Sequence, residues 1–208
     1  MIPKDRPGGA ALCVYHEGQK VVDTWGGTKD RYLTDWQEDT LAFSASTTKG
    51  VISTLMHILV DQGLADYEDK VSNYWPAFAQ NGKQDITIRH VMTHEAGLHS
   101  VSELISEPEE LLDWHKLLEK ITAAKPSHIS GTQSAYHGLT YGHILGGIIE
   151  KITGKDFTDV LQQELVDPRV LDGMFIGVPD SDIHRCAKII SCDGYIDKGF
   201  KRSNRGKL

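Results

Sequence analysis

The sequence predicts an α/β (α+β) protein in which an N-terminal antiparallel hairpin precedes a larger helical region. Three observations support this prediction. Residues 10–15 and 20–26 are short runs rich in strand-forming side chains. An apolar helical pattern starts just after Ser46, and a second one covers residues 139–152. Strands first and helices afterwards are typical of this fold class.

The hairpin is predicted from composition and from the turn between its strands. Ala-Ala-Leu-Cys-Val-Tyr and Lys-Val-Val-Asp-Thr-Trp-Gly flank the polar residues 16–19, which include Gly18. Two β-rich runs joined by a short glycine-containing turn are typical of a β-hairpin.

The helix after Ser46 is apolar on most sides, so we expect it to be buried. It is predicted to end at Gly63, because glycine readily adopts the left-handed conformation that closes a helix. Its apolar residues are Val51, Ile52, Leu55, Met56, Ile58 and Leu59.

Two further helices are predicted in the middle of the chain. Thr87 is expected to cap a short helix that ends near Gly97. Ser106 and Glu109 fit a capping box with an early Pro108. The box precedes apolar residues at helical spacing, namely Leu111, Leu112, Trp114, Leu117, Leu118 and Ile121.

The helix predicted over residues 139–152 contains Gly142, Gly146 and Gly147. Each glycine costs about 1 kcal/mol of helix propensity relative to alanine, so we expect the glycines to serve close helix packing. Gly154 is expected to end this helix. A last helix is predicted over residues 157–166, closed by Asp167-Pro168.

Bulk composition indicates a soluble globular protein. The 208 residues are 39% hydrophobic and 25% charged, and the net charge is −7. An acidic chain is unlike a nucleic-acid binder, whose footprint is normally basic. No stretch approaches the roughly 20 apolar residues of a membrane span. The first residues do not resemble a signal peptide, so the expected location is cytoplasmic.

We expect a single partial domain over residues 1–208. Residues 191–208 carry several basic side chains without apolar periodicity, which predicts a disordered basic tail. The three cysteines, Cys13, Cys186 and Cys192, are odd in number and lack a C-x-x-C spacing. Free thiols are the simpler interpretation.

The strongest chemical signal is Ser46 with Lys49, an S-x-x-K motif at the start of the apolar helix. Residues three apart share one helix face, so the lysine amine can reach the serine hydroxyl. A serine hydroxyl is a weak nucleophile unless a neighbouring base takes its proton. The alternative interpretation is that the serine only caps the helix. Ser44 is a second candidate nucleophile, but no lysine follows it at the same spacing.

With its flanking phrases, this motif resembles the serine β-lactamase-related family, which includes class C-like esterases and penicillin-recognising hydrolases. The resemblance covers about residues 8–190, and the order and spacing of its phrases make it specific. The phrases lie at residues 9–15, 21–27, 39–41, 74–78, 86–98, 131–137 and 145–154.

The resemblance implies a β-lactamase/transpeptidase-like fold and a set of roles. Ser46 would attack an ester or amide carbonyl and form an acyl-enzyme. Lys49 would share its proton or tune its pKa. Tyr136 would act as base and then as acid to the leaving group. His137 and Gly138 would contact the substrate, and neither a metal nor an organic cofactor is implied.

Two departures from the family pattern matter. The Y-x-N motif reads Tyr136-His137-Gly138 here, so the amide that helps to hold a β-lactam is missing, which favours an esterase. Family members also continue past this point with a strand that carries K-T-G or H-x-G. The C-terminal sheet strands are therefore expected to be missing, and the chain is expected to be a fragment.

The function expected is a serine hydrolase acting on small esters or amides, possibly β-lactams. The alternative is a weak or inactive truncated scaffold or regulatory fragment of the same family, and a peptidoglycan-peptide binder is a third class. Loss of an oxyanion donor costs on the order of 10² to 10³ in rate, so we expect weak activity. The sequence does not determine the oligomeric state.

Two histidine hypotheses compete with these roles. His90, His94 and His99 suggest a zinc site, but Leu98 stands where an H-E-x-x-H motif would place its second histidine. His137 beside Tyr136 is an alternative base. In both cases a satisfied structural histidine is the simpler interpretation.

Overall fold

The computed structural model describes residues 7–189, which form parts of two compact units. One unit contains residues 1–44 and 173–208, and the other contains residues 45–172. The prediction of a single partial domain stays a prediction.

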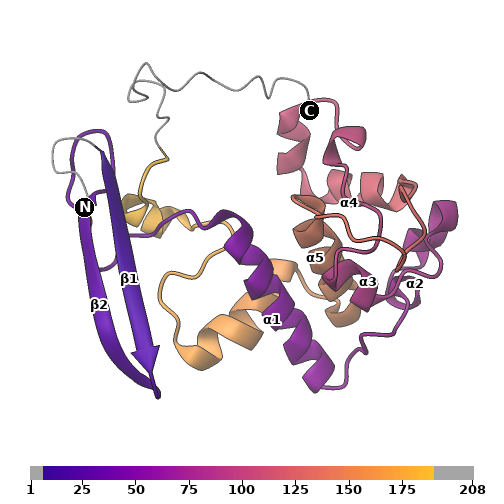
Figure 1. Cartoon of the computed structure of the whole chain (residues 1–208), viewed down its shortest axis with the longest axis horizontal. Helices are drawn as coiled ribbons and strands as arrows, with labels where there is room; N and C mark the ends of the chain where they lie inside the picture. Colours follow the sequence, from indigo (N-terminus) through magenta and orange to yellow (C-terminus); the bar gives the residue numbers. More distant parts are fainter. Residues whose placement is uncertain (1–6, 190–208) are drawn as a thin grey trace. The chain divides into compact units, whose positions relative to one another are not determined.

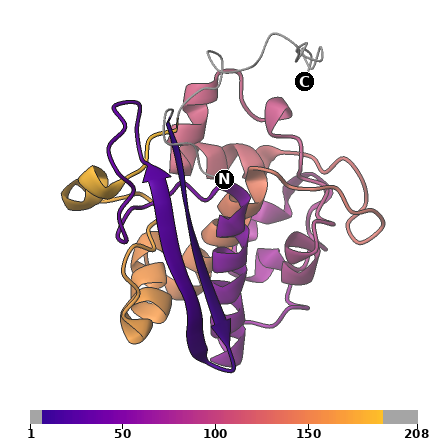
Figure 2. The ribbon, with the colours of Figure 1, turned by 60° about the vertical axis from the view of Figure 1, so that its left-hand side comes forward.

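The first unit contains the predicted hairpin. Strands β1 (Gly8–His16) and β2 (Gln19–Thr28) pair in antiparallel register (Figure 2). Glu17 and Gly18 both have positive φ, 49° and 76°, as a tight two-residue hairpin turn requires. The hairpin is confirmed, with strands slightly longer than predicted.

Apolar side chains lie exposed on both faces of this hairpin. Leu12, Val14 and Val22 share one face, and Leu12 is 57% exposed. Trp25 lies on the opposite face and is 40% exposed. A sheet with one solvent-exposed face normally places polar residues on that face. Apolar residues on both faces are typical of strands that are covered on both sides.

The other described residues of this unit, 29–44 and 173–189, are irregular apart from a short 3₁₀ helix at Asp180–Arg185. Leu41 and Cys186 form an isolated parallel bridge. Arg185 pairs with Asp182 at 2.7 Å. Cys13 and Cys186 are free thiols, as expected, and Cys192 lies outside the described residues.

The core of the second unit is built by helices α1 (Thr48–Asp61) and α5 (Thr140–Thr153), which pack against each other (Figure 1). Fully buried side chains of the two helices include Leu55 and Met56 of α1 and Ile144 and Ile148 of α5. Both predicted helices are confirmed. Gly63 and Gly154, with φ of 73° and 68°, follow their C-terminal ends as expected.

Shorter helical segments surround this pair. They are α2 (Val71–Tyr74), a 3₁₀ segment (Pro76–Gly82) and α3 (Ile88–Met92). The Thr87 side chain accepts a hydrogen bond from the His90 backbone N–H at 3.2 Å, so the predicted cap is confirmed. Helix α3 stops earlier than predicted.

The capping box predicted at Ser106 is wrong. The Ser106 N–H donates to the Glu110 carboxylate at 2.9 Å, and only 3₁₀ turns form here, at Val101–Glu103 and Pro108–Leu112. Helix α4 (Trp114–Ala123) begins later, where the Asp113 carboxylate accepts from the Lys116 N–H at 3.0 Å. An aspartate cap closer to the apolar run therefore sets the helix start.

The last predicted helix is a composite. Helix α6 (Phe157–Leu161) continues into a π turn (Gln162–Val166) and a 3₁₀ turn (Asp167–Arg169). The helical path therefore continues through Asp167-Pro168, where it was predicted to close. Proline is tolerated there because it stands in the first turn of the 3₁₀ segment.

Two of the three helix glycines allow close packing. A Cβ added to Gly146 would lie 2.6 Å from Trp114 Cη2, and one added to Gly147 would lie 2.9 Å from Trp75 Cζ3. At Gly142 the nearest atom is Ile52 Cδ1, the end of a flexible side chain, at 3.3 Å. Close packing therefore explains Gly146 and Gly147 but not Gly142.

Within residues 7–189, no helix has the length and apolar character that crossing a bilayer requires. The predicted basic tail at 191–208 lies outside the described residues.

Candidate active site

Ser46 lies in a 3₁₀ turn (Ala45–Thr47) that runs directly into α1. Its side chain is exposed. The N-terminal turn of a helix leaves backbone N–H groups without intrahelical acceptors and carries a partial positive charge. Ser46 is therefore accessible and lies at the end of α1 that favours negative charge.

Lys49 extends from the first turn of α1 towards two oxygen atoms. Its Nζ lies 3.3 Å from Ser46 Oγ and 2.6 Å from the Gly138 carbonyl oxygen. The shorter bond fixes the amine, and the longer one places it against the serine hydroxyl. The contact predicted from the S-x-x-K spacing is thus present.

Tyr136 completes the group. Its hydroxyl donates a hydrogen bond to Ser46 Oγ at 2.8 Å. The side chain is 58% exposed, so the phenol is open to a ligand. The hydrogen bond with Ser46, followed by the influence of Lys49, lowers the pKa of the Tyr136 phenol. A lowered phenol pKa increases the fraction of phenolate, the form that can act as a base.

Two tyrosine rings lie near the amine. Lys49 Nζ lies 4.8 Å from the centre of the Tyr136 ring and 6.0 Å from that of Tyr141. The buried Tyr141 hydroxyl pairs with Ser53 Oγ at 2.6 Å, and Ser53 Oγ donates to the Lys49 carbonyl at 2.8 Å. Sequence reasoning missed Tyr141. Its partner Ser53 lies one helical turn after Lys49, so the sequence placed Ser53, but not Tyr141, beside the lysine on α1.

His137 has no exposed surface. Its Nε2 accepts from the Leu98 N–H at 3.0 Å, so its Nδ1 donates to the Ala135 carbonyl at 2.7 Å. Burial lowers the pKa of this imidazole to about 4. Both ring nitrogens are therefore used by the backbone, and the substrate contact predicted for His137 stays a prediction.

Gly138 enters the site through its backbone. Its carbonyl accepts the Lys49 bond, and its N–H donates to the Tyr136 carbonyl at 2.9 Å. The substrate contact predicted for Gly138 is likewise untested.

His94 also lies beside the site, although the sequence analysis considered it only as a metal ligand. Its ring lies 4.9 Å from the Tyr136 ring and 4.8 Å from the Tyr141 ring, centre to centre. The nearby His90 uses its Nδ1 to accept from the Thr87 N–H at 3.2 Å. Among the described residues no three histidine, cysteine or acidic side chains gather as metal ligands.

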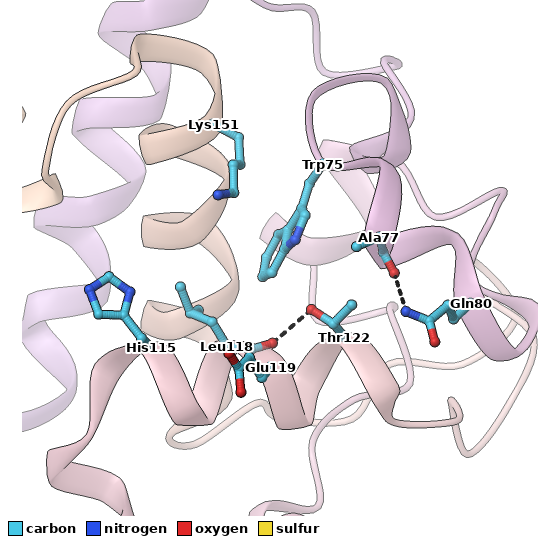
Figure 3. Close-up of a pocket in the computed structure, with 8 residues that line it drawn as sticks. All are labelled: Trp75, Ala77, Gln80, His115, Leu118, Glu119, Thr122 and Lys151. Carbon is cyan, nitrogen blue, oxygen red and sulfur yellow. Dashed lines mark hydrogen bonds between the residues drawn. The ribbon is translucent and has the colours of Figure 1, made fainter.

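A separate surface hollow of about 410 Å³ lies between α4, α5 and the Pro76–Gly82 segment (Figure 3). Its lining includes Trp75, Leu118 and Lys151, but none of Ser46, Lys49 and Tyr136. Two of its polar lining side chains bond locally, Thr122 Oγ1 to the Leu118 carbonyl at 2.8 Å and Gln80 Nε2 to the Ala77 carbonyl at 2.9 Å. The hydrogen-bonded trio, and not this hollow, is therefore the candidate site.

Comparison with known proteins gives consistent matches. A family model described as Beta-lactamase matches residues 4–200. The Mycobacterium tuberculosis protein named Esterase/beta-lactamase LipL is 43% identical over 192 residues, which are 91% of this chain and 44% of that protein. A Beta-lactamase of Escherichia coli (strain K12) is 24% identical over 182 residues, 88% of this chain and 47% of its own.

Solved structures agree. A penicillin-binding protein homologue from Caulobacter crescentus matches with a TM-score of 0.83 and 35% identity, over 89% of this chain and 50% of its own. A family VIII carboxylesterase matches with the same TM-score and identity, over 89% of this chain and 51% of the carboxylesterase chain. The chain thus spans about half the length of the relatives and structures that it matches.

Proposed function

Because this chain belongs to the Beta-lactamase family of serine hydrolases, we propose that it hydrolyses small esters through an acyl-enzyme on Ser46. The predicted fold class is confirmed by the likeness to the Caulobacter crescentus structure. The observation that carries the proposal is the convergence of the Tyr136 hydroxyl and the Lys49 amine on one serine oxygen.

In the acylation step, Ser46 Oγ attacks the carbonyl carbon and its proton passes to the Tyr136 phenolate. The bond from the carbonyl carbon to the leaving oxygen then breaks, and Tyr136 returns the proton to that oxygen. The positive charge of Lys49 favours the phenolate that takes the proton. In the second step the Tyr136 phenolate takes a proton from water while the water oxygen attacks the acyl carbon. The bond from that carbon to Ser46 Oγ then breaks, Tyr136 returns the proton to Ser46 Oγ, and the acid is released.

The developing oxyanion needs hydrogen-bond donors that are already in place. The backbone N–H of Ser46 fits this role because it lies in the turn that begins α1. Preorganised donors of this kind, held at a helix N-terminus, favour negative charge without further rearrangement.

Esters are proposed ahead of β-lactams for two reasons. Gly138 offers no side-chain amide to hold a β-lactam. The names of LipL and of the carboxylesterase structure include esterase activity for those proteins.

The test is covalent labelling of the purified chain by a fluorophosphonate, followed by mass spectrometry of the Ser46 peptide. Labelling of Ser46 that Ser46→Ala abolishes supports the hydrolase, and Ser44→Ala serves as the matched control. Hydrolysis of p-nitrophenyl butyrate and of nitrocefin then ranks ester against β-lactam. Absence of label on a folded chain contradicts the proposal.

A second candidate is a catalytically weak or inactive scaffold. The exposed apolar side chains on both hairpin faces favour it, because such strands are usually covered. This candidate predicts a folded chain whose Ser46 reacts with the probe no faster than a free serine.

A further inference from the structure

The segment that carries Tyr136 has no regular secondary structure. Residues 133–137 belong to neither a helix nor a strand. No helical or sheet ladder therefore fixes the phenol on Ser46, and other contacts must hold it there.

His94 contacts the chain on both sides of Tyr136. The Ala135 N–H donates to the His94 carbonyl at 2.9 Å. The His137 N–H donates to His94 Nδ1 at 3.1 Å. The His94 ring also packs against the Tyr136 ring, with 4.9 Å between centres. One residue thus bonds the two neighbours of Tyr136 and lies beside its ring.

The backbone at His94 is itself unusual. His94 follows α3 with a φ of 64°, in the left-handed region, which is uncommon for residues other than glycine although asparagine, aspartate and histidine are enriched there. Unfavourable backbone conformations of this kind persist where the surrounding contacts require them.

We propose that His94 is a positioning residue, which holds Ala135 and His137 so that the Tyr136 hydroxyl reaches Ser46. It acts through Tyr136 and does not touch the reacting atoms. This role rests on the proposed function, because Tyr136 is the acid and base of that reaction.

Two substitutions separate the hydrogen bond from the backbone conformation. His94→Asn and His94→Gly both tolerate positive φ. Only asparagine carries a side-chain oxygen that can accept the His137 N–H. The first readout is the ¹³C NMR titration of the Tyr136 phenol, assigned with Tyr136→Phe, and the second is the rate of Ser46 labelling.

The expected result is a split between the two variants. In His94→Gly the phenol pKa rises towards that of free tyrosine, and labelling slows by about a hundredfold, the loss that a misplacement near 1 Å causes. His94→Asn keeps the lowered phenol pKa and labels at close to the original rate. A His94→Gly chain that folds, titrates and labels like the original overturns the inference.

Two further outcomes are decisive. If His94→Gly fails to fold, the His94→Asn variant decides the matter. A folded His94→Asn chain whose Tyr136 titrates as free tyrosine overturns the inference. A folded His94→Asn chain that keeps the lowered phenol pKa supports it. If the unaltered chain does not label, the hydrolase proposal fails. The NMR titration still tests His94, since it needs no turnover.

Discussion

The Tyr136 hydroxyl lies 2.8 Å from Ser46 Oγ, although 90 positions separate the two residues in the sequence. The serine belongs to the turn before α1, and the tyrosine belongs to a segment without regular structure. Their contact is what distinguishes this serine from an ordinary helix cap, because a cap needs no phenol.

Tyr136→Phe is expected to slow phosphonate labelling of Ser46 by about 10²- to 10⁴-fold, the usual contribution of a general acid–base group. The ring and its contact with His94 remain, so the thermal unfolding midpoint should change little. Tyr67→Phe is the matched control, because its hydroxyl bonds His57 at 2.7 Å, away from Ser46. Equal labelling rates in both variants would remove Tyr136 from the mechanism.

Lys49→Met tests the influence of the amine on the phenol. The Ser46 hydrogen bond, and after it Lys49, lowers the pKa of Tyr136, so loss of the positive charge should raise that pKa. Less phenolate is then present at a given pH, and the alkaline midpoint of the labelling profile moves to higher pH. The ¹³C titration of Tyr136 measures the shift directly.

Lys155→Met serves as the control for this substitution, because Lys155 Nζ bonds the Gln163 side chain at 2.7 Å on the surface. An unchanged Tyr136 titration in folded Lys49→Met would contradict the assigned electrostatic role.

The S-x-x-K spacing predicted the Lys49 contact because it depends only on helix geometry, which is local. Tyr136 came from the family resemblance, since nothing local ties residue 136 to residue 46. The anchoring by His94 could not be predicted, because it depends on a left-handed backbone and on two bonds to a distant segment.

The same difference between local signals and distant contacts explains which parts of the fold were predicted. Glycine turns and apolar periodicity located the hairpin and helices α1 and α5. The start of α4 was misplaced because two capping signals compete near Pro108, and the Asp113 cap, closer to the apolar run, sets the start.

The free energy of unfolding should fall as the pH is lowered, because His137 becomes protonated more readily in the unfolded chain than in the folded one. Burial holds the pKa of the folded imidazole at about 4, below the ordinary 6.5. The neutral ring therefore contributes stability that is fully present above pH 6.5 and is lost as the pH falls towards 4. Between pH 7.5 and pH 4.5 this loss should reach about 2 to 3 kcal/mol.

Urea unfolding at the two pH values, for the original chain and for His137→Gln, measures this loss. Glutamine does not titrate, and its side-chain oxygen offers an acceptor to the Leu98 N–H. The glutamine variant should lose correspondingly less stability on acidification, whatever its stability at pH 7.5. Equal acid sensitivity in the two chains would rule out His137 as the cause.

The helix glycines give a matched test of packing. Gly146→Ala would place a methyl group 2.6 Å from Trp114 Cη2, and a hydrogen bond from Trp114 Nε1 to Glu150 Oε1 at 3.0 Å holds that ring in place. Overpacking of this kind costs about 1–3 kcal/mol of unfolding free energy. Gly142→Ala, in the same helix, meets only the end of Ile52 at 3.3 Å. It should be neutral or gain up to about 1 kcal/mol of helix propensity.

Urea or thermal unfolding of both variants decides the point, because helix propensity is common to them and only the contact differs. A Gly146→Ala chain as stable as Gly142→Ala would show that α4 and α5 do not approach as closely as the Trp114 contact requires. The predicted order, with Gly142→Ala the more stable, follows from a single side chain lying over Gly146.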